Sequence, residues 1–265
     1  LYSLFWMVKK MKINIILTLF IGVILAQEFT ADEIIKKVEL APKPNTSITE
    51  VKLEITRFKR GKEKIKIREF SRFQKFYKSG KFKSKSIIRF HEPKIVKGAG
   101  LLSWSRKNGD TDQWIFLPKL KAAKQVKAKE KSKKFMGTDF RYEDLENRKQ
   151  GQDSVVIIGN EYFQGSQCKV LMAYPKDESI YFSRKIWIDT FNWNIQKIEF
   201  YLTELKREKT LIFSEFITVD RYMTPGILTM DIEDEKNNTI MIIKSFKPNI
   251  GLKDEIFTES FLVKN

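Results

Sequence analysis

Apolar and polar side chains alternate with a period of two in the segments that follow residue 50, although several later segments are not cleanly two-faced. Val51, Leu53 and Ile55 alternate with polar neighbours, and Ile65 and Ile67 repeat the pattern among lysines. Because successive side chains of an extended strand point to opposite faces, these segments predict strands with one solvated face. Further strands are predicted at residues 84–91, 101–107, 112–118, 154–160, 167–174, 180–189, 194–203, 208–219, 227–233 and 238–247.

Turn signals separate many of these segments. Asn108-Gly109-Asp110 predicts a hairpin turn, and Gly159-Asn160 and Pro225-Gly226 predict further turns. About a dozen strands at a spacing of roughly ten residues indicate one large antiparallel sheet, curled or closed. Transmembrane barrels alternate too, but lysines and arginines fill the polar positions of the early strands, which favours a soluble barrel.

One segment near the N-terminus has a helical period instead. Residues 30–40 place Ile34, Ile35 and Val38 on one stripe, which is typical of a short amphipathic helix. Thr30 with Glu33 three residues later has the spacing of a capping box, which predicts the start of this helix.

The first 26 residues have the pattern of an export signal. Lys9, Lys10 and Lys12 precede an apolar run from Ile13 to Ala26 that is shorter than a membrane-spanning helix. We therefore expect a signal peptide over residues 1–26 cleaved near Ala26, a periplasmic protein, and a single domain over residues 27–265. Removing three lysines lowers the net charge from +17 to +14.

The composition of the chain limits its expected binding partners and the kinds of site it can form. The net charge of +17 and the pI of about 9.7 indicate attraction to nucleic acid, anionic lipid or another polyanion, without choosing between them. Cys168 is the one cysteine and His91 the one histidine, so neither a disulfide framework nor a histidine-based metal or catalytic site is expected. We predict no catalytic residue, no metal and no cofactor.

Residues 89–146 carry the most distinctive sequence. Eight lysines occupy residues 119–134 against the single acid Glu130, and the apolar pair Phe135-Met136 follows directly. Two interpretations remain open for this pair: a mobile lid whose apolar tip reaches a cavity, or a loop pinned to the core by two side chains.

This region resembles the outer-membrane lipoprotein-sorting family, relatives of the periplasmic carriers LolA and LolB. The resemblance rests on Trp114-Ile115-Phe116-Leu117-Pro118-Lys119-Leu120-Lys121, on Phe135-Met136-Gly137-Thr138-Asp139-Phe140, and on Gly251-Leu252 with Ile256-Phe257-Thr258 near the C-terminus. It implies a mainly β fold with a helical lid, a half-open curved antiparallel β-barrel of about eleven strands around an apolar cavity.

The resemblance also implies a function. The protein would carry acyl chains of lipids or lipoproteins between envelope membranes and would not be an enzyme. Expected partners are those acyl chains, an inner-membrane transporter of the resistance-nodulation-division (RND) type, and an anionic membrane surface in transient contact, with no nucleic acid. The expected ligand-binding residues of the cavity or rim are Trp104, Trp114, Phe116, Leu117, Phe135, Met136, Phe140 and Tyr142.

Two rival hypotheses stay open. An exported polyanion-binding module, for nucleic acid or surface polysaccharide, would use the aromatic residues interleaved with lysines between Phe70 and Phe82 as stacking platforms. A hydrolase would use the clustered acids Asp139, Glu143 and Asp144, but the chain has no G-x-S-x-G motif.

Overall fold

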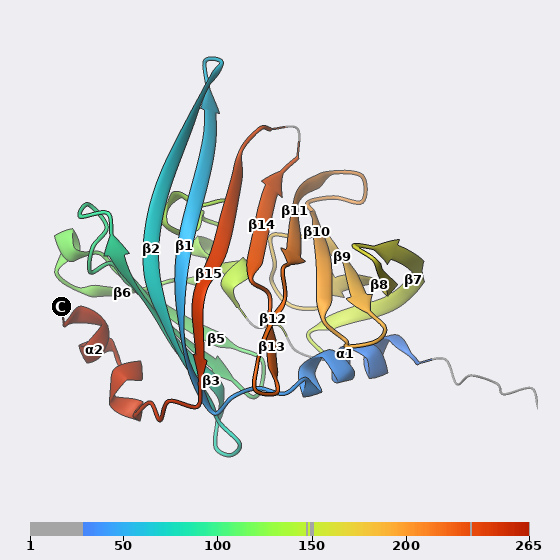
Figure 1. The fold of residues 1–265 in the computed structure, drawn as a ribbon, viewed down its shortest axis with the longest axis horizontal. Helices are drawn as coiled ribbons and strands as arrows, with labels where there is room; N and C mark the ends of the chain where they lie inside the picture. The colour runs from blue at the N-terminus through green and yellow to red at the C-terminus, as the bar shows by residue number, and fades with distance from the viewer. Residues whose placement is uncertain (1–28, 147, 149–150, 234, 265) are drawn as a thin grey trace, which may run out of the picture.

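A computed structural model describes residues 29–146, 148, 151–233 and 235–264. The predicted signal peptide lies outside these residues. The fold is one large antiparallel sheet in the order β6-β5-β4-β3-β2-β1-β15-β14-β11-β10-β9-β8-β7 (Figure 1). Its strands are β1 Thr46–Lys59, β2 Lys62–Phe76, β3 Phe82–Glu92, β4 Gly100–Arg106, β5 Thr111–Phe116, β6 Ala123–Gln125, β7 Asp153–Phe163, β8 Ser166–Pro175, β9 Ser183–Asp189, β10 Ile195–Tyr201, β11 Arg207–Ser214, β14 Ile227–Ile232 and β15 Asn238–Pro248.

The sheet is a meander whose two halves are joined by the pairing of β1 with β15. Its edges are β6 and β7, which are consecutive in the chain and do not pair, so the curved sheet stays open. A small second sheet pairs β12 Ile217–Val219 with β13 Tyr222–Thr224. The fold class expected from the sequence, a half-open curved antiparallel barrel, is therefore confirmed, with thirteen strands in the main sheet.

The concave face of the sheet holds most of the core. We call the half of the sheet from β6 to β1 the first limb and the half from β15 to β7 the second limb. On the first limb, a buried cluster contains Leu53, Phe90 and Leu101. On the second limb, another contains Phe200, Leu211 and Met230. Met241 of β15 packs against both clusters, so the apolar surface is continuous across the join. Helix α1 (Ala31–Leu40) closes one end of this face, because its Ile34 is fully buried against β8 and β9.

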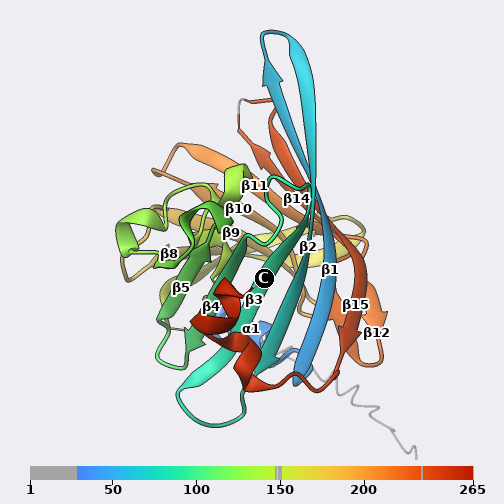
Figure 2. The ribbon, with the colours of Figure 1, turned by 90° about the vertical axis from the view of Figure 1, so that its left-hand side faces the viewer.

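The convex face is covered only in part. Short helix α2 (Glu259–Val263) lies against β3, β4 and β5 (Figure 2) and buries Leu262 with Ile87 and Leu102. Gly100 makes this contact possible: a Cβ there would lie 2.6 Å from the Ile88 carbonyl oxygen and 2.9 Å from Leu262.

Local predictions hold at most elements. Thr30 and Glu33 form the expected capping box of α1, and β4 pairs with β5 across Asn108-Gly109. The predicted turn at Gly159-Asn160 is wrong, because β7 continues through a bulge between Ile157 and Gly159 and turns at Gln164-Gly165 instead. A glycine in a strand can mark a bulge as well as a turn. No helix among the described residues is long and apolar enough to span a bilayer.

Candidate functional site

Residues 126–146, which follow β6, lie across the concave face of the sheet. We call these residues the cover segment. It contains no α-helix; three short 3-10 turns, at Ala128–Glu130, Phe135–Gly137 and Glu143–Leu145, make up its regular structure. The helical cover expected from the sequence therefore consists of α1 together with these turns.

Phe135 anchors the cover segment in the first limb. Its side chain is 1% exposed and lies among Leu53, Phe90 and Leu101, with its ring centroid 6.0 Å from that of Phe90. Phe140, which is 2% exposed, belongs to the cluster of the second limb. Two aromatic rings of one short segment thus fill the space between the limbs.

A tight left-handed turn separates the two rings. Met136 has φ 49° and Gly137 has φ 72°, a region that glycine enters without steric cost. The turn is held by arginines of the sheet: Arg68 donates to the Met136 carbonyl oxygen, and Arg57 donates to the Gly137 carbonyl oxygen at 2.9 Å. Met136 itself packs at the margin of the first cluster.

The acids of the cover segment pair with basic residues of the sheet. Buried Asp139 accepts a hydrogen bond from Arg57 at 2.8 Å and another from the Thr239 hydroxyl at 2.8 Å. Glu143 accepts from Arg184 of β9 at 2.5 Å, with both side chains about 95% buried. Each acid is thereby satisfied by a strand far away in the sequence.

Asp144 makes the most deeply buried of these pairs. Its carboxylate lies 2.5 Å from the Lys209 ammonium, both side chains being 1% exposed, and accepts from the Tyr181 hydroxyl at 2.8 Å. Burial lowers the pKa of Lys209, and the facing Asp144 carboxylate opposes that shift. Burial, and then Asp144, raises the pKa of Tyr181. Burial of an ion pair adds little net stability, but removing one partner is costly.

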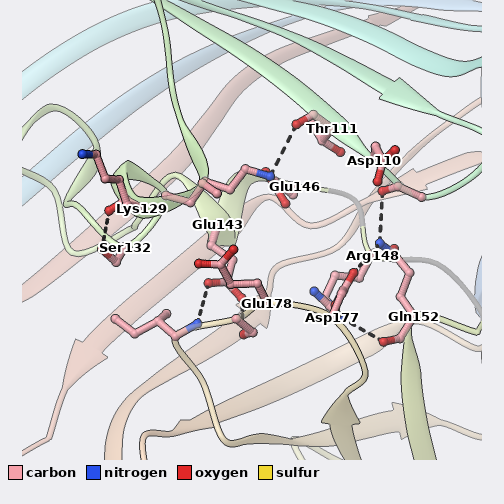
Figure 3. A pocket seen from close by; sticks show the side chains of 15 residues that line it. Asp110, Thr111, Lys129, Ser132, Glu143, Glu146, Arg148, Gln152, Asp177 and Glu178 are labelled. Carbon is pink, nitrogen blue, oxygen red and sulfur yellow. Dashed lines mark hydrogen bonds and ion pairs between the residues drawn. The ribbon is translucent and has the colours of Figure 1, made fainter.

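A polar pocket of about 330 Å³ opens beside the cover segment (Figure 3). Arg148, Asp177 and Gln152 line one side, while Lys129 and Ser132 of the cover segment line the other. Both signs of charge meet in this pocket, so it does not offer the apolar surface that an acyl chain needs.

The structure divides the predicted ligand-binding residues between the two faces of the sheet. Leu117, Phe135, Met136 and Tyr142 belong to the concave cluster of the first limb, and Phe140 belongs to that of the second. Trp104, Trp114 and Phe116 lie on the convex face in the cluster that α2 covers. The Trp104 indole donates to the Phe257 carbonyl oxygen at 2.9 Å, which fixes it to the C-terminal segment.

Alternation along β5 predicts that Trp114 and Phe116 share a face, and they do. It does not predict that this face is the convex one. Arg57, Arg184 and Lys209 were missed as partners of the cover segment. The only sequence signal for them is a basic residue within an otherwise alternating strand.

A Ser–His contact exists that the sequence did not indicate. Ser71 Oγ lies 2.6 Å from His91 Nε2 and 2.7 Å from a carboxylate oxygen of Glu50. In a catalytic triad the acid orients the histidine, whereas Glu50 contacts the serine. Ser71 is also only 4% exposed, so this cluster lacks the geometry of a hydrolase site. In the part of the chain that the structure describes, no three His, Cys, Asp or Glu side chains could hold a metal ion together.

Comparisons with known proteins agree with the geometry. The chain is similar to a putative outer membrane lipoprotein-sorting protein domain from Vibrio parahaemolyticus, with 24% identity and a TM-score of 0.82 over 88% of this chain and 98% of that one. A DUF1329 family protein from Desulfovibrio piger gives 24% identity and 0.80 over 88% and 97%. A LolA superfamily protein from Nitrosomonas europaea gives 19% identity and 0.68 over 88% and 100%.

No protein with a curated description matches the chain. A family model described as "-like: Uncharacterized protein" matches residues 83–264, which is more than half of the sequence. The chain therefore belongs to the family that this model describes, and it has the LolA-like fold of the lipoprotein-sorting proteins.

Proposed function

We propose that the protein binds acyl chains of lipids or lipoproteins on the concave face of its sheet, and carries them between envelope membranes. The observation that carries this proposal is that two aromatic rings of the cover segment occupy the continuous apolar surface of the concave face. In the proposed cycle the cover segment leaves this face as an acyl chain enters.

The way the cover segment is attached supports its displacement. Its β-bridge, between Lys134 and Arg141, lies within the segment itself. Its attachment to the limbs combines two buried rings with ion pairs through Asp139, Glu143 and Asp144. Side-chain contacts of this kind can break while the sheet keeps its backbone hydrogen bonds, which favours local opening over global unfolding.

Acyl chains match the surface that the cover segment fills. Each methylene moved out of water contributes about 0.8 kcal/mol, so two or three acyl chains, as in a lipoprotein, bind much better than one.

The remaining expectations from the sequence join this proposal. We propose that residues 1–26 direct export, that the protein acts in the periplasm without catalysing a reaction, and that an RND-type transporter supplies or receives its cargo. The polyanion-binding alternative has less support, because Phe70 is buried in the concave cluster whereas Phe73 packs on the opposite face. These rings cannot form one accessible stacking row.

The decisive experiment is to purify the full protein from the envelope of its own cell or a close relative. Native mass spectrometry of the intact protein, beside an organic extract of the same sample, is expected to show bound lipid in stoichiometric amount. A lipid-free protein that also fails to take up a fluorescent fatty acid would contradict the proposal.

A further inference from the structure

The hairpin between β1 and β2 projects well beyond the rest of the sheet (Figures 1 and 2). We call residues 57–67 the hairpin tip. Arg60 and Gly61 form its turn, both with positive φ, and every residue from 58 to 67 is exposed. Six basic residues against the single acid Glu63 give the tip a net charge of 6 − 1 = +5.

One face of the hairpin tip carries a row of large apolar side chains beside Glu63. The register pairs Phe58 with Glu63, Thr56 with Ile65, and Glu54 with Ile67. Because paired residues share a face and alternate along each strand, Phe58, Ile65 and Ile67 lie on the same face. Their exposed fractions are 40%, 57% and 49%, which leaves a row of large apolar side chains in water.

The opposite face of the tip is basic. Lys59 pairs directly with Lys62, and Arg57 pairs with Lys64. Like charges directly across an antiparallel pair destabilise it. Arg57 bonds to Asp139 of the cover segment, but among the residues described here Lys59, Lys62 and Lys64 form no ion pair. The tip therefore carries an uncompensated cationic row with an apolar row behind it.

We propose that the hairpin tip docks the protein on an anionic lipid bilayer. Lipid phosphates would neutralise the row formed by Lys59, Lys62 and Lys64, while Ile65 and Ile67 enter the boundary between headgroups and acyl chains. A basic face and an apolar face on one projecting element are the features of interfacial membrane anchors. A soluble acidic polymer would neutralise the lysines but would leave the isoleucines in water, so a bilayer satisfies both rows.

A neighbouring turn places one more basic side chain beside the apolar row of the tip. The Lys236 ammonium lies 5.8 Å from the centre of the Phe58 ring, and the Phe58 N–H donates to the Asn237 side chain at 2.9 Å. The docking surface involves none of the concave clusters. It thus goes beyond the acyl-carrier proposal and is tested separately from it.

The test is flotation of the full protein with vesicles of phosphatidylcholine, with or without about 30% phosphatidylglycerol. Each basic side chain near such a surface adds about 1 kcal/mol, and 1.4 kcal/mol is tenfold. The double charge reversal Lys62→Glu with Lys64→Glu is therefore expected to lower partitioning to the anionic vesicles at least tenfold. The variant Ile65→Ser with Ile67→Ser is expected to lose the binding that persists at high salt.

Matched controls lie away from the tip. Lys78→Glu with Lys81→Glu makes the same charge change at exposed positions at the other end of β2, and Leu40→Ser with Phe191→Ser removes two apolar side chains that are 70% and 92% exposed. Both controls are expected to bind within twofold of the parent protein. Equal loss in the controls, unchanged binding of the tip variants, or equal binding to neutral vesicles would each overturn the proposal. Loss in the lysine variant alone would also overturn it, because the contact would then be purely electrostatic.

Discussion

Replacing Phe135 by alanine separates two roles for the cover segment. If Phe135 occupies the place of an acyl chain, the variant binds acyl chains more tightly, because the closed form that competes with the ligand is weakened. If Phe135 is instead a wall of the binding site, the same variant binds them less tightly. Only the first outcome agrees with the function proposed here.

The expected change in affinity for acyl chains follows from the burial of the Phe135 ring. Phe135 is 1% exposed and packs against Phe90 and Tyr142, with ring centroids 6.0 and 5.6 Å apart. Removing a core phenylalanine side chain costs about 3–5 kcal/mol. In the open form the ring is in water, so removing it costs almost no free energy. A 3 kcal/mol shift of the closed-to-open equilibrium raises the apparent affinity about 100-fold, up to the limit where the segment is fully open.

The assay is a fluorescence titration with a fatty-acid probe, at a temperature where circular dichroism shows the variant to be folded. Phe257→Ala is the matched control, because Phe257 is 0% exposed but lies in the convex cluster under α2. It should destabilise the protein by a similar amount in urea without tightening the probe. Weaker probe binding by a folded Phe135→Ala protein would refute the reasoning, as would equal tightening in the control.

Three further predictions concern the fold. Lys209→Met and Asp144→Asn should each lower the free energy of unfolding in urea by about 3–5 kcal/mol because each strands a buried polar partner, and the double variant should cost clearly less than their sum; additive losses would mean that the pair is not coupled. Gly100→Ala should lower the melting temperature and release α2, because its Cβ would meet both the Ile88 carbonyl oxygen and the Leu262 side chain of α2, and an unchanged melting curve would contradict these contacts. Burial raises the pKa of Cys168 to about 11, so Ellman's reagent should label this thiol at pH 8 only after unfolding, and rapid labelling of the native protein would argue against its burial.

Much of the local structure follows from residues close together in the sequence. Alternation identifies β1 because its polar and apolar positions are separated cleanly, and the Thr30–Glu33 spacing identifies the start of α1. The three-residue strands β6 and β13 were not predicted, since so few residues carry no detectable period. The single strand predicted at residues 208–219 is wrong, because the chain breaks at Glu215, with φ 50°, into β11 and β12. The apolar Phe135-Met136 pair after a lysine run marked the cover segment as unusual without revealing its neighbours.

The sequence by itself determined that this chain forms a large antiparallel sheet with an irregular, lysine-rich segment in its middle. Only the tertiary structure decided which face of that sheet is concave. Both faces of β4 and β5 are apolar, with Leu101 on one and Leu102 and Trp114 on the other, so alternation assigns residues to faces but cannot say which face the sheet encloses. The two halves of the sheet are joined by the pairing of β1 with β15, and the cover segment is held by partners far away in the sequence, such as Lys209 for Asp144. Contacts of such long range depend on how the strands are ordered in space, and no local pattern encodes that order.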